Sequence, residues 1–201
     1  MRHPGGTLRT VATHLGQDRS PSVGPTNLLY HTQNSPKTGY DVWVLPLEGN
    51  RKPVLLLGEQ FNEWGAVFSP DMHWIAYAST ETNPANVFVR RFRVSEAGFP
   101  GSSGGKWQVS KDGGNWPRWR IQNEIAFLTS FRDRAKVAAT VHTQGSEFGG
   151  DVPKLLFTGP LDTGFDVTPD GQRFLLAVPR IQTTGPAPLA IVLNWPALLK
   201  K

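Results

Sequence analysis

The chain has 201 residues, 38% of them hydrophobic, including 7 Trp and 11 Phe, which excludes a disordered polypeptide and is enough for one large domain or two small ones. It contains no cysteine, so disulfide frameworks, thiolate zinc sites and cysteine nucleophiles are excluded. The net charge is +5, but the basic residues are spread along the chain, and we expect no nucleic-acid partner.

The first 26 residues show no alternation of apolar and polar side chains. They are rich in Gly, Pro, Ser, Thr and His, which predicts a poorly ordered lead-in or the eroded remnant of an earlier repeat. Met1–Gly6 is not followed by the apolar segment of a signal peptide, and no stretch approaches the roughly 20 apolar residues of a membrane span.

From Asn27 onward, short apolar runs alternate with turn residues, which predicts four successive units of β-strands. The units cover residues 27–64, 65–115, 116–163 and 164–201. The first should hold strands at 28–32, 40–45 and 54–57, and the second at 66–68, 74–78, 87–92 and 107–110. The third should hold strands at 118–119, 124–128, 135–141 and 155–157, and the fourth at 164–167, 173–178 and 189–195.

The same turn motif recurs in these units. Ser69-Pro70-Asp71 precedes the strand at 74–78, and Thr168-Pro169-Asp170-Gly171 precedes the strand at 173–178. Proline presets such a turn and aspartate caps it through backbone amides, so we assign these residues and Pro117 of the third unit to structural turns.

A period of about 50 residues with several short strands per period is typical of β-propeller blades. We therefore predict an all-β fold, a partial β-propeller of three to four four-stranded antiparallel blades. The large apolar residues of the repeats are predicted to form its core: Trp43, Phe68, Trp74, Trp119, Phe174 and Trp195.

The ordered set of motifs resembles a known family, the C-terminal WD40-like (PD40 or TolB-like) β-propeller region of bacterial membrane-bound serine/threonine protein kinases. The resemblance covers residues 27–201. It is carried by residues 36–47, 61–63, 68–71, 105–110, 117–120 and 166–175, and by the ending at 192–201.

The chain departs from the family pattern in two turns and in one domain. Met72 stands where relatives carry glycine after Ser-Pro-Asp, and Ile121-Gln122-Asn123 replaces an Asp-Gly turn. The glycine-rich loop, the His-Arg-Asp loop and the Asp-Phe-Gly motif of a kinase do not occur, so the chain cannot phosphorylate a substrate.

Several motifs could carry chemistry, and each has a structural explanation that we prefer. Residues 101–105 match the Gly-x-Ser-x-Gly pattern of serine hydrolases, but a flexible loop between two strands explains them better. Residues 110–116 resemble an Asp-box turn of sialidases, and we interpret them as the link between two blades. The five His residues show no metal-ligand spacing, and we predict neither a metal nor a cofactor.

The predicted function is that of a non-catalytic sensor or protein-interaction module, whose binding surface is one end face of the propeller. The longest loops there are predicted at 79–86 and 94–105. The resemblance implies an extracytoplasmic location, and a protein or a small ligand as partner. Two alternatives remain open: a propeller glycoside hydrolase or lyase with carboxylates near the axis, and a half-propeller that closes by dimerising.

Overall fold

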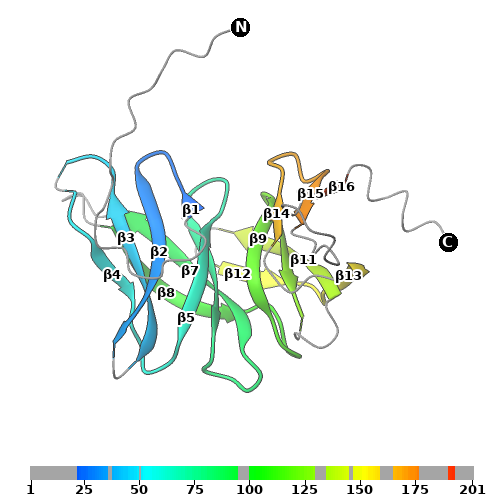
Figure 1. Ribbon diagram of the computed structural model, residues 1–201, viewed down its shortest axis with the longest axis horizontal. Coiled ribbons are helices and arrows are strands. Elements are labelled where there is room, and N and C mark those ends of the chain that lie inside the picture. Colours follow the sequence, from blue (N-terminus) through cyan, green and yellow to red (C-terminus); the bar gives the residue numbers. More distant parts are fainter. Residues whose placement is uncertain are drawn as a thin grey trace, which may run out of the picture.

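The computed structural model describes residues 22–35, 38–49, 51–94, 100–129, 135–144, 147–158, 165–176 and 190–192. Within these ranges the chain forms strands and no helix, so the predicted all-β class is confirmed. The strands form separate antiparallel sheets that follow one another along the long axis of the molecule, as Figure 1 shows. This is the architecture of a partial β-propeller.

The four sheets are numbered here in chain order. Sheet 1 contains β1 (Ser22–Val23), β2 (Asn27–Ser35), β3 (Gly39–Pro46) and β4 (Val54–Leu57). Sheet 2 contains β5 (Glu63–Phe68), β6 (Trp74–Ser79), β7 (Asn86–Val94) and β8 (Pro100–Gln108). Sheet 3 contains β9 (Asn115–Ile121), β10 (Glu124–Leu128), β11 (Ala135–Gln144), β12 (Glu147–Gly150) and β13 (Lys154–Thr158). Sheet 4 contains β14 (Phe165–Val167), β15 (Phe174–Leu176) and β16 (Ala190–Val192).

The first strands of the sheets are neighbours, since β1 contacts β5, β5 contacts β9, and β9 contacts β14. These first strands therefore lie along one common side of the row of sheets. Within sheets 1, 2 and 4 each strand pairs with the strand before it in the chain, and in sheet 3 both β12 and β13 pair with β11.

The core lies between the sheets and follows from the two-residue period of a strand. In β6, Ile75 and Tyr77 pack toward sheet 1, whereas Trp74 and Ala76 pack toward sheet 3. Every residue of β6 is buried as a result. Strand β10 repeats the pattern between sheets 2 and 4, with Ile125 and Phe127 on one face and Ala126 and Leu128 on the other.

The predicted core aromatics occupy different depths in this arrangement. Phe68, Trp74 and Phe174 are buried, whereas Trp43 and Trp119 are half-buried and pack against clusters of buried side chains. Trp195 lies outside the described residues.

The two turns with the repeated motif share one hydrogen-bond pattern. In the β5–β6 turn, the Ser69 hydroxyl donates to Asp71 Oδ1 (2.5 Å) and accepts the Trp74 N–H (2.9 Å). In the β14–β15 turn, the Thr168 hydroxyl donates to Asp170 and accepts the Arg173 N–H (3.1 Å). Each aspartate also accepts the N–H two residues further on, so the motif closes both ends of a tight turn.

The residue after each aspartate adopts a left-handed backbone. This residue is Gly171 in sheet 4, with φ 68°, and Met72 in sheet 2, with φ 60°. A side chain in this region costs about 1–2 kcal/mol. The Met72 side chain is half-buried against the core between sheets 1 and 2 and covers the backbone of Gly24, so its packing offsets part of that cost.

Three segments differ from the sequence-based expectations. Sheet 1 begins at Ser22, because the two residues of β1 pair with Leu28 and Leu29, and so part of the expected lead-in belongs to the sheet. Residues 100–105 form the first half of β8 and pair with β7, so they are a strand and not the predicted flexible loop. Pro117 lies inside β9 and not in the β9–β10 turn.

None of the described residues forms a helix that is long and apolar enough to cross a membrane.

The left-handed turn residue leads to a stability prediction. Met72→Gly and Met72→Ala remove the same packing, but only glycine relieves the backbone strain. We expect Met72→Gly to be the more stable of the two by about 1 kcal/mol in urea unfolding. The same pair of substitutions at exposed His73, which has no left-handed φ, is the control and should give the opposite order. Equal stability of the two Met72 variants would contradict the role of strain.

Candidate ligand-binding pocket

A cavity of about 320 Å³ opens where sheets 1, 2 and 3 meet, at the end of the propeller where β5 and β9 begin. We call it the aromatic pocket. Three sheets contribute to it, together with the loop after β6. Its lining residues are His31, Tyr40, Asn62, Trp64, Thr80 and Trp116. The turn residues of the repeated motif follow the other ends of β5 and β14, so these two turns lie at the opposite end from the pocket, whereas Pro117 lies next to Trp116 in β9.

Equivalent bulges in β5 and β9 shape the pocket wall. In β5, Gly65 and Ala66 lie opposite one residue of β6, and in β9, Trp116 and Pro117 lie opposite Phe127 of β10. The first residue of each bulge is left-handed: Gly65 has φ 64° and Trp116 has φ 51°. Glycine is the usual residue at such a position. Trp116 therefore stands where the preceding repeat has glycine.

The indole of Trp116 packs directly on Gly65. A Cβ atom at Gly65 would lie 3.2 Å from Trp116 Cε3, closer than an ordinary van der Waals contact. Glycine at position 65 thus avoids both the strain of a left-handed φ and a tight contact with the ring above it. Strained backbones of this kind persist where the surroundings hold them, and they cluster at ligand sites.

Hydrogen bonds fix the polar residues of the pocket. The Tyr40 N–H donates to Asn62 Oδ1 (3.0 Å), and the Asn62 N–H donates to the Thr80 hydroxyl (3.0 Å). Among the rings, His31 lies edge-on to Tyr40, with ring centroids 5.7 Å apart. The centroids of His31 and Trp116 are 6.3 Å apart. The pocket is therefore largely preformed and mostly apolar, as small-ligand sites usually are.

Two buried carboxyl groups lie beside the pocket in the chain. Glu63 precedes Trp64 and is 1% exposed, and Asp41 follows Tyr40 and is 7% exposed. Glu63 Oε2 and Asp41 Oδ1 have no hydrogen-bond partner among the described residues. Burial, together with the nearby charges of Glu59 and Asp41, raises the pKa of Glu63 to about 8.

Next to these acids, an ion network joins the chain between sheets 1 and 2 to sheet 2. Glu59 contacts Arg90 and Lys106, and Lys106 also contacts Glu81. Burial opposes ionisation of Glu59, but Arg90 and Lys106 outweigh it and lower the pKa of Glu59. Arg90 also donates to the Tyr77 hydroxyl (3.1 Å), so both cations of the network have partners.

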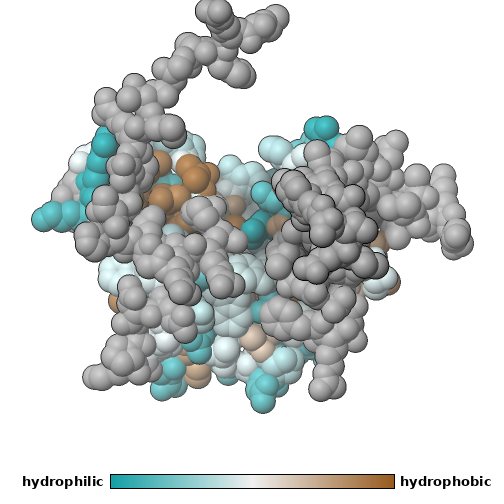
Figure 2. All heavy atoms as spheres, in the orientation of Figure 1, coloured by the Kyte–Doolittle hydropathy of each residue, from teal (hydrophilic) through white to brown (hydrophobic). Residues whose placement is uncertain are grey.

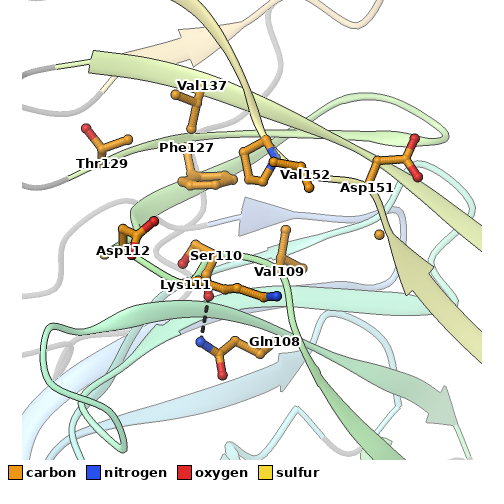
Figure 3. Close-up of a pocket in the computed structure, with 13 residues that line it drawn as sticks. Gln108, Val109, Ser110, Lys111, Asp112, Phe127, Thr129, Val137, Asp151 and Val152 are labelled. Carbon is orange, nitrogen blue, oxygen red and sulfur yellow. Dashed lines mark hydrogen bonds between the residues drawn. The ribbon is translucent and has the colours of Figure 1, made fainter.

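A second cavity, of about 290 Å³, lies between sheets 2 and 3 (Figure 3). Phe127 of β10 faces Val109 and Ser110 of the segment after β8 across it. Ser110 is fully engaged inside the fold, because its hydroxyl donates to Asn86 Oδ1 (2.6 Å) and accepts the Val87 N–H (2.8 Å). The segment that resembles an Asp-box is therefore fastened to the start of β7 in sheet 2, as the chain passes on to sheet 3.

The serine of the hydrolase-like pattern also has a structural contact. The Ser102 hydroxyl donates to the Leu56 carbonyl oxygen of β4 (3.3 Å), which links sheet 2 to sheet 1. No group of three or more metal-ligating side chains occurs within the described part of the chain.

Sequence reasoning did not identify the aromatic pocket. The predicted turn residues do not line it, and of the two predicted binding loops only 79–86 contributes, through Thr80. One signal of the pocket lies in the comparison of repeats. When β5 and β9 are aligned at their bulges, Trp116 corresponds to Gly65 of the preceding repeat, and a large aromatic residue stands out at a glycine position.

Comparisons with known proteins leave the family of this chain open. No protein-family model matches it, and no curated protein matches it. Among solved structures, it is similar to TolB from Acinetobacter baumannii, with 12% sequence identity and a TM-score of 0.36. The match covers 84% of this chain and 61% of the TolB chain, so the chain spans about three fifths of that protein.

Proposed function

We propose that the chain is a non-catalytic recognition module that binds its partner or ligand at the aromatic pocket. The main observation behind this proposal is the placement of Trp116. This large ring stands at a left-handed bulge position where the preceding repeat has glycine. Trp116 is half-buried: it packs on Gly65 and against the core between sheets 3 and 4, and it also lines the cavity. An aromatic pocket whose polar residues are already held by hydrogen bonds is suited to binding.

We further propose that this module is the extracytoplasmic part of a bacterial serine/threonine protein kinase. The support is the ordered set of sequence motifs that resembles the propeller region of those kinases. In this proposal the four units at 27–64, 65–115, 116–163 and 164–201 are blades, and the kinase domain belongs to a part of the protein outside this chain.

One observation favours a second candidate, a propeller glycoside hydrolase. Asp41 of sheet 1 and Glu63 of sheet 2 come from different sheets. Burial, with the charges of Glu59 and Asp41, raises the pKa of Glu63, as expected of a general acid. Both groups are buried, however, and neither lines the aromatic pocket. A general acid must reach the bond that it protonates, so we prefer a structural role for both.

The pH dependence of stability tests the buried state of Glu63. Between pH 4.5, where the unfolded side chain ionises, and about pH 8, the folded chain keeps a proton that the unfolded chain loses. Stability should therefore fall as the pH rises, by on the order of 4 kcal/mol between pH 5 and pH 9. Glu63→Gln should remove this part of the fall in urea unfolding, whereas Glu48→Gln, at an exposed site, should not. An unchanged pH profile in Glu63→Gln would contradict the raised pKa.

A direct assay separates the binding module from the hydrolase. We expect the chain to release no chromophore from aryl glycosides above the level of Asp41→Asn and Glu63→Gln. Turnover by the unaltered chain that either substitution abolishes would establish the hydrolase and exclude the non-catalytic proposal.

The kinase association is tested at the gene. We expect the coding DNA upstream of Met1 to continue in frame into a kinase domain and a membrane span. The native protein should then run much larger than 22.1 kDa on an immunoblot. An upstream stop codon and a product of 22.1 kDa would remove the kinase association and leave the pocket unaffected.

A further inference from the structure

Met72 holds the only sulfur atom of the described residues. The sequence has no cysteine and two methionines, and the other methionine, Met1, lies outside the described ranges. Oxidation of a methionine to its sulfoxide turns a flexible apolar side chain into a polar one and disrupts the packing around it. What such a change would do depends on the contacts of Met72.

The Met72 side chain fills a close contact between sheets 1 and 2. It runs from the β5–β6 turn to the β1–β2 turn, where a Cβ atom at Gly24 would lie 2.3 Å from Met72 Cε and 2.8 Å from Met72 Sδ. The same side chain packs against the core between the two sheets. On the side of Gly24, therefore, the sulfur has no room for an additional atom.

The junction of sheets 3 and 4 shows what Met72 replaces. Gly171 holds the equivalent position in the β14–β15 turn, and a Cβ atom there would lie 2.7 Å from the Arg120 carbonyl oxygen of β9. The Gly171 carbonyl oxygen accepts a hydrogen bond from Arg120 Nε (2.8 Å). Sheets 3 and 4 are thus joined here through a backbone contact and a hydrogen bond. Between sheets 1 and 2 the thioether of Met72 stands in that place, and the glycine, Gly24, belongs to the other sheet.

Strand β1 is short, so the contact with Met72 matters for its attachment. The strand comprises Ser22 and Val23, which pair with β2 of the same sheet. Its hydrogen bond to sheet 2, among the described residues, runs from the Phe68 N–H of β5 to Ser22 Oγ (3.2 Å). Val23 is 69% exposed. Packing of Met72 on Gly24 is therefore a main link between the β1–β2 turn and sheet 2.

A small oxidant can reach Met72 from solvent. The residue is half-buried and lines a cavity of about 340 Å³, together with the β1–β2 turn and the end of β7. Figure 2 shows hydrophobic side chains at the surface around the β1–β2 turn. A water molecule needs only about 10–15 Å³ of such space. Hydrogen peroxide is little larger than water, so the cavity admits it.

We propose that Met72 is a site of oxidation by peroxide, at which sulfoxide formation releases the β1–β2 turn from sheet 2. One oxygen atom passes from hydrogen peroxide to Met72 Sδ: the O–O bond breaks, the S–O bond forms and water leaves. The sulfur is oxidised and the peroxide is reduced, so the step needs no other reagent. A polar sulfoxide is unfavourable against the apolar core and the Gly24 backbone, so the side chain leaves this contact. The proposal is independent of the aromatic pocket, which lies at the other end of β5.

The first test measures access to Met72. The full chain is treated with hydrogen peroxide, and peptide mapping by mass spectrometry follows the gain of oxygen at Met72, with the chain unfolded in urea as the reference. Oxidation that required global unfolding would be slower than this reference by about a thousandfold or more, given the folding equilibrium constants of small domains. We expect the folded chain to be oxidised well above that limit.

The second test measures what the sulfoxide does. Oxidation should lower the folding equilibrium constant in urea by about tenfold, which corresponds to about 1.4 kcal/mol. The amides of Gly24 and Phe68, which donate at the β1–β2 turn and to Ser22, should exchange with solvent faster. Their increase should exceed that of the amides of β10 in sheet 3. A methionine sulfoxide reductase should restore the slow exchange.

Two variants tie these effects to Met72. Met72→Leu keeps an apolar side chain of similar volume without the sulfur, and peroxide should change neither its stability nor its amide exchange. Gly24→Ala places a Cβ where Met72 Cε and Sδ lie, which displaces the end of the flexible side chain from the turn. Met72 should therefore be oxidised faster in Gly24→Ala than in the unaltered chain.

Each part of the proposal can fail separately. Oxidation of Met72 only at the rate of global unfolding would overturn the access to the sulfur. A sulfoxide at Met72 that leaves exchange at Gly24 and Phe68 unchanged would overturn the release of the turn, and so would an equal response of Met72→Leu to peroxide. The comparison of treated and untreated chain needs no variant, so it decides the matter even if a variant does not fold.

Discussion

The structure depends on one constraint, which is that a sheet between two others must bury both of its faces. Strands β6 and β10 meet this by sending alternate side chains to opposite neighbours, so that Ile75 and Trp74, adjacent in the chain, belong to different cores. A one-residue shift of register would exchange the two cores, which fixes the register strongly.

The turns and bulges show how repeats of the same plan tolerate different residues. Gly171 and Met72 adopt the same left-handed conformation, as do Gly65 and Trp116. In both pairs one repeat has the unstrained residue and the other has a side chain with additional contacts. Met72 covers Gly24 and packs against the core between sheets 1 and 2, whereas Trp116 packs on Gly65 and against the core between sheets 3 and 4. Both replacements contribute to packing, and Trp116 also forms part of the wall of the aromatic pocket.

Glu63 is buried and has a raised pKa, and these two properties point to different roles for its side chain. Its carboxyl group has the raised pKa typical of a general acid, but its side chain is enclosed and an oxygen has no hydrogen-bond partner among the described residues. Of the rings of the aromatic pocket beside it, Tyr40, Trp64 and Trp116 are half-buried and His31 is buried.

The sequence by itself determined the all-β class and the repeated turns, because strand alternation and the Ser/Thr-Pro-Asp motif are local properties that survive in any context. It misassigned residues 100–105, since a Gly/Ser-rich segment has no strand signal of its own and pairs only because β7 lies beside it. The pocket required the tertiary structure, because His31, Trp64 and Trp116 are far apart in the chain and meet only when three sheets pack together. The strain at Trp116 was likewise invisible, since a backbone dihedral at a bulge depends on the pairing of β9 with β10.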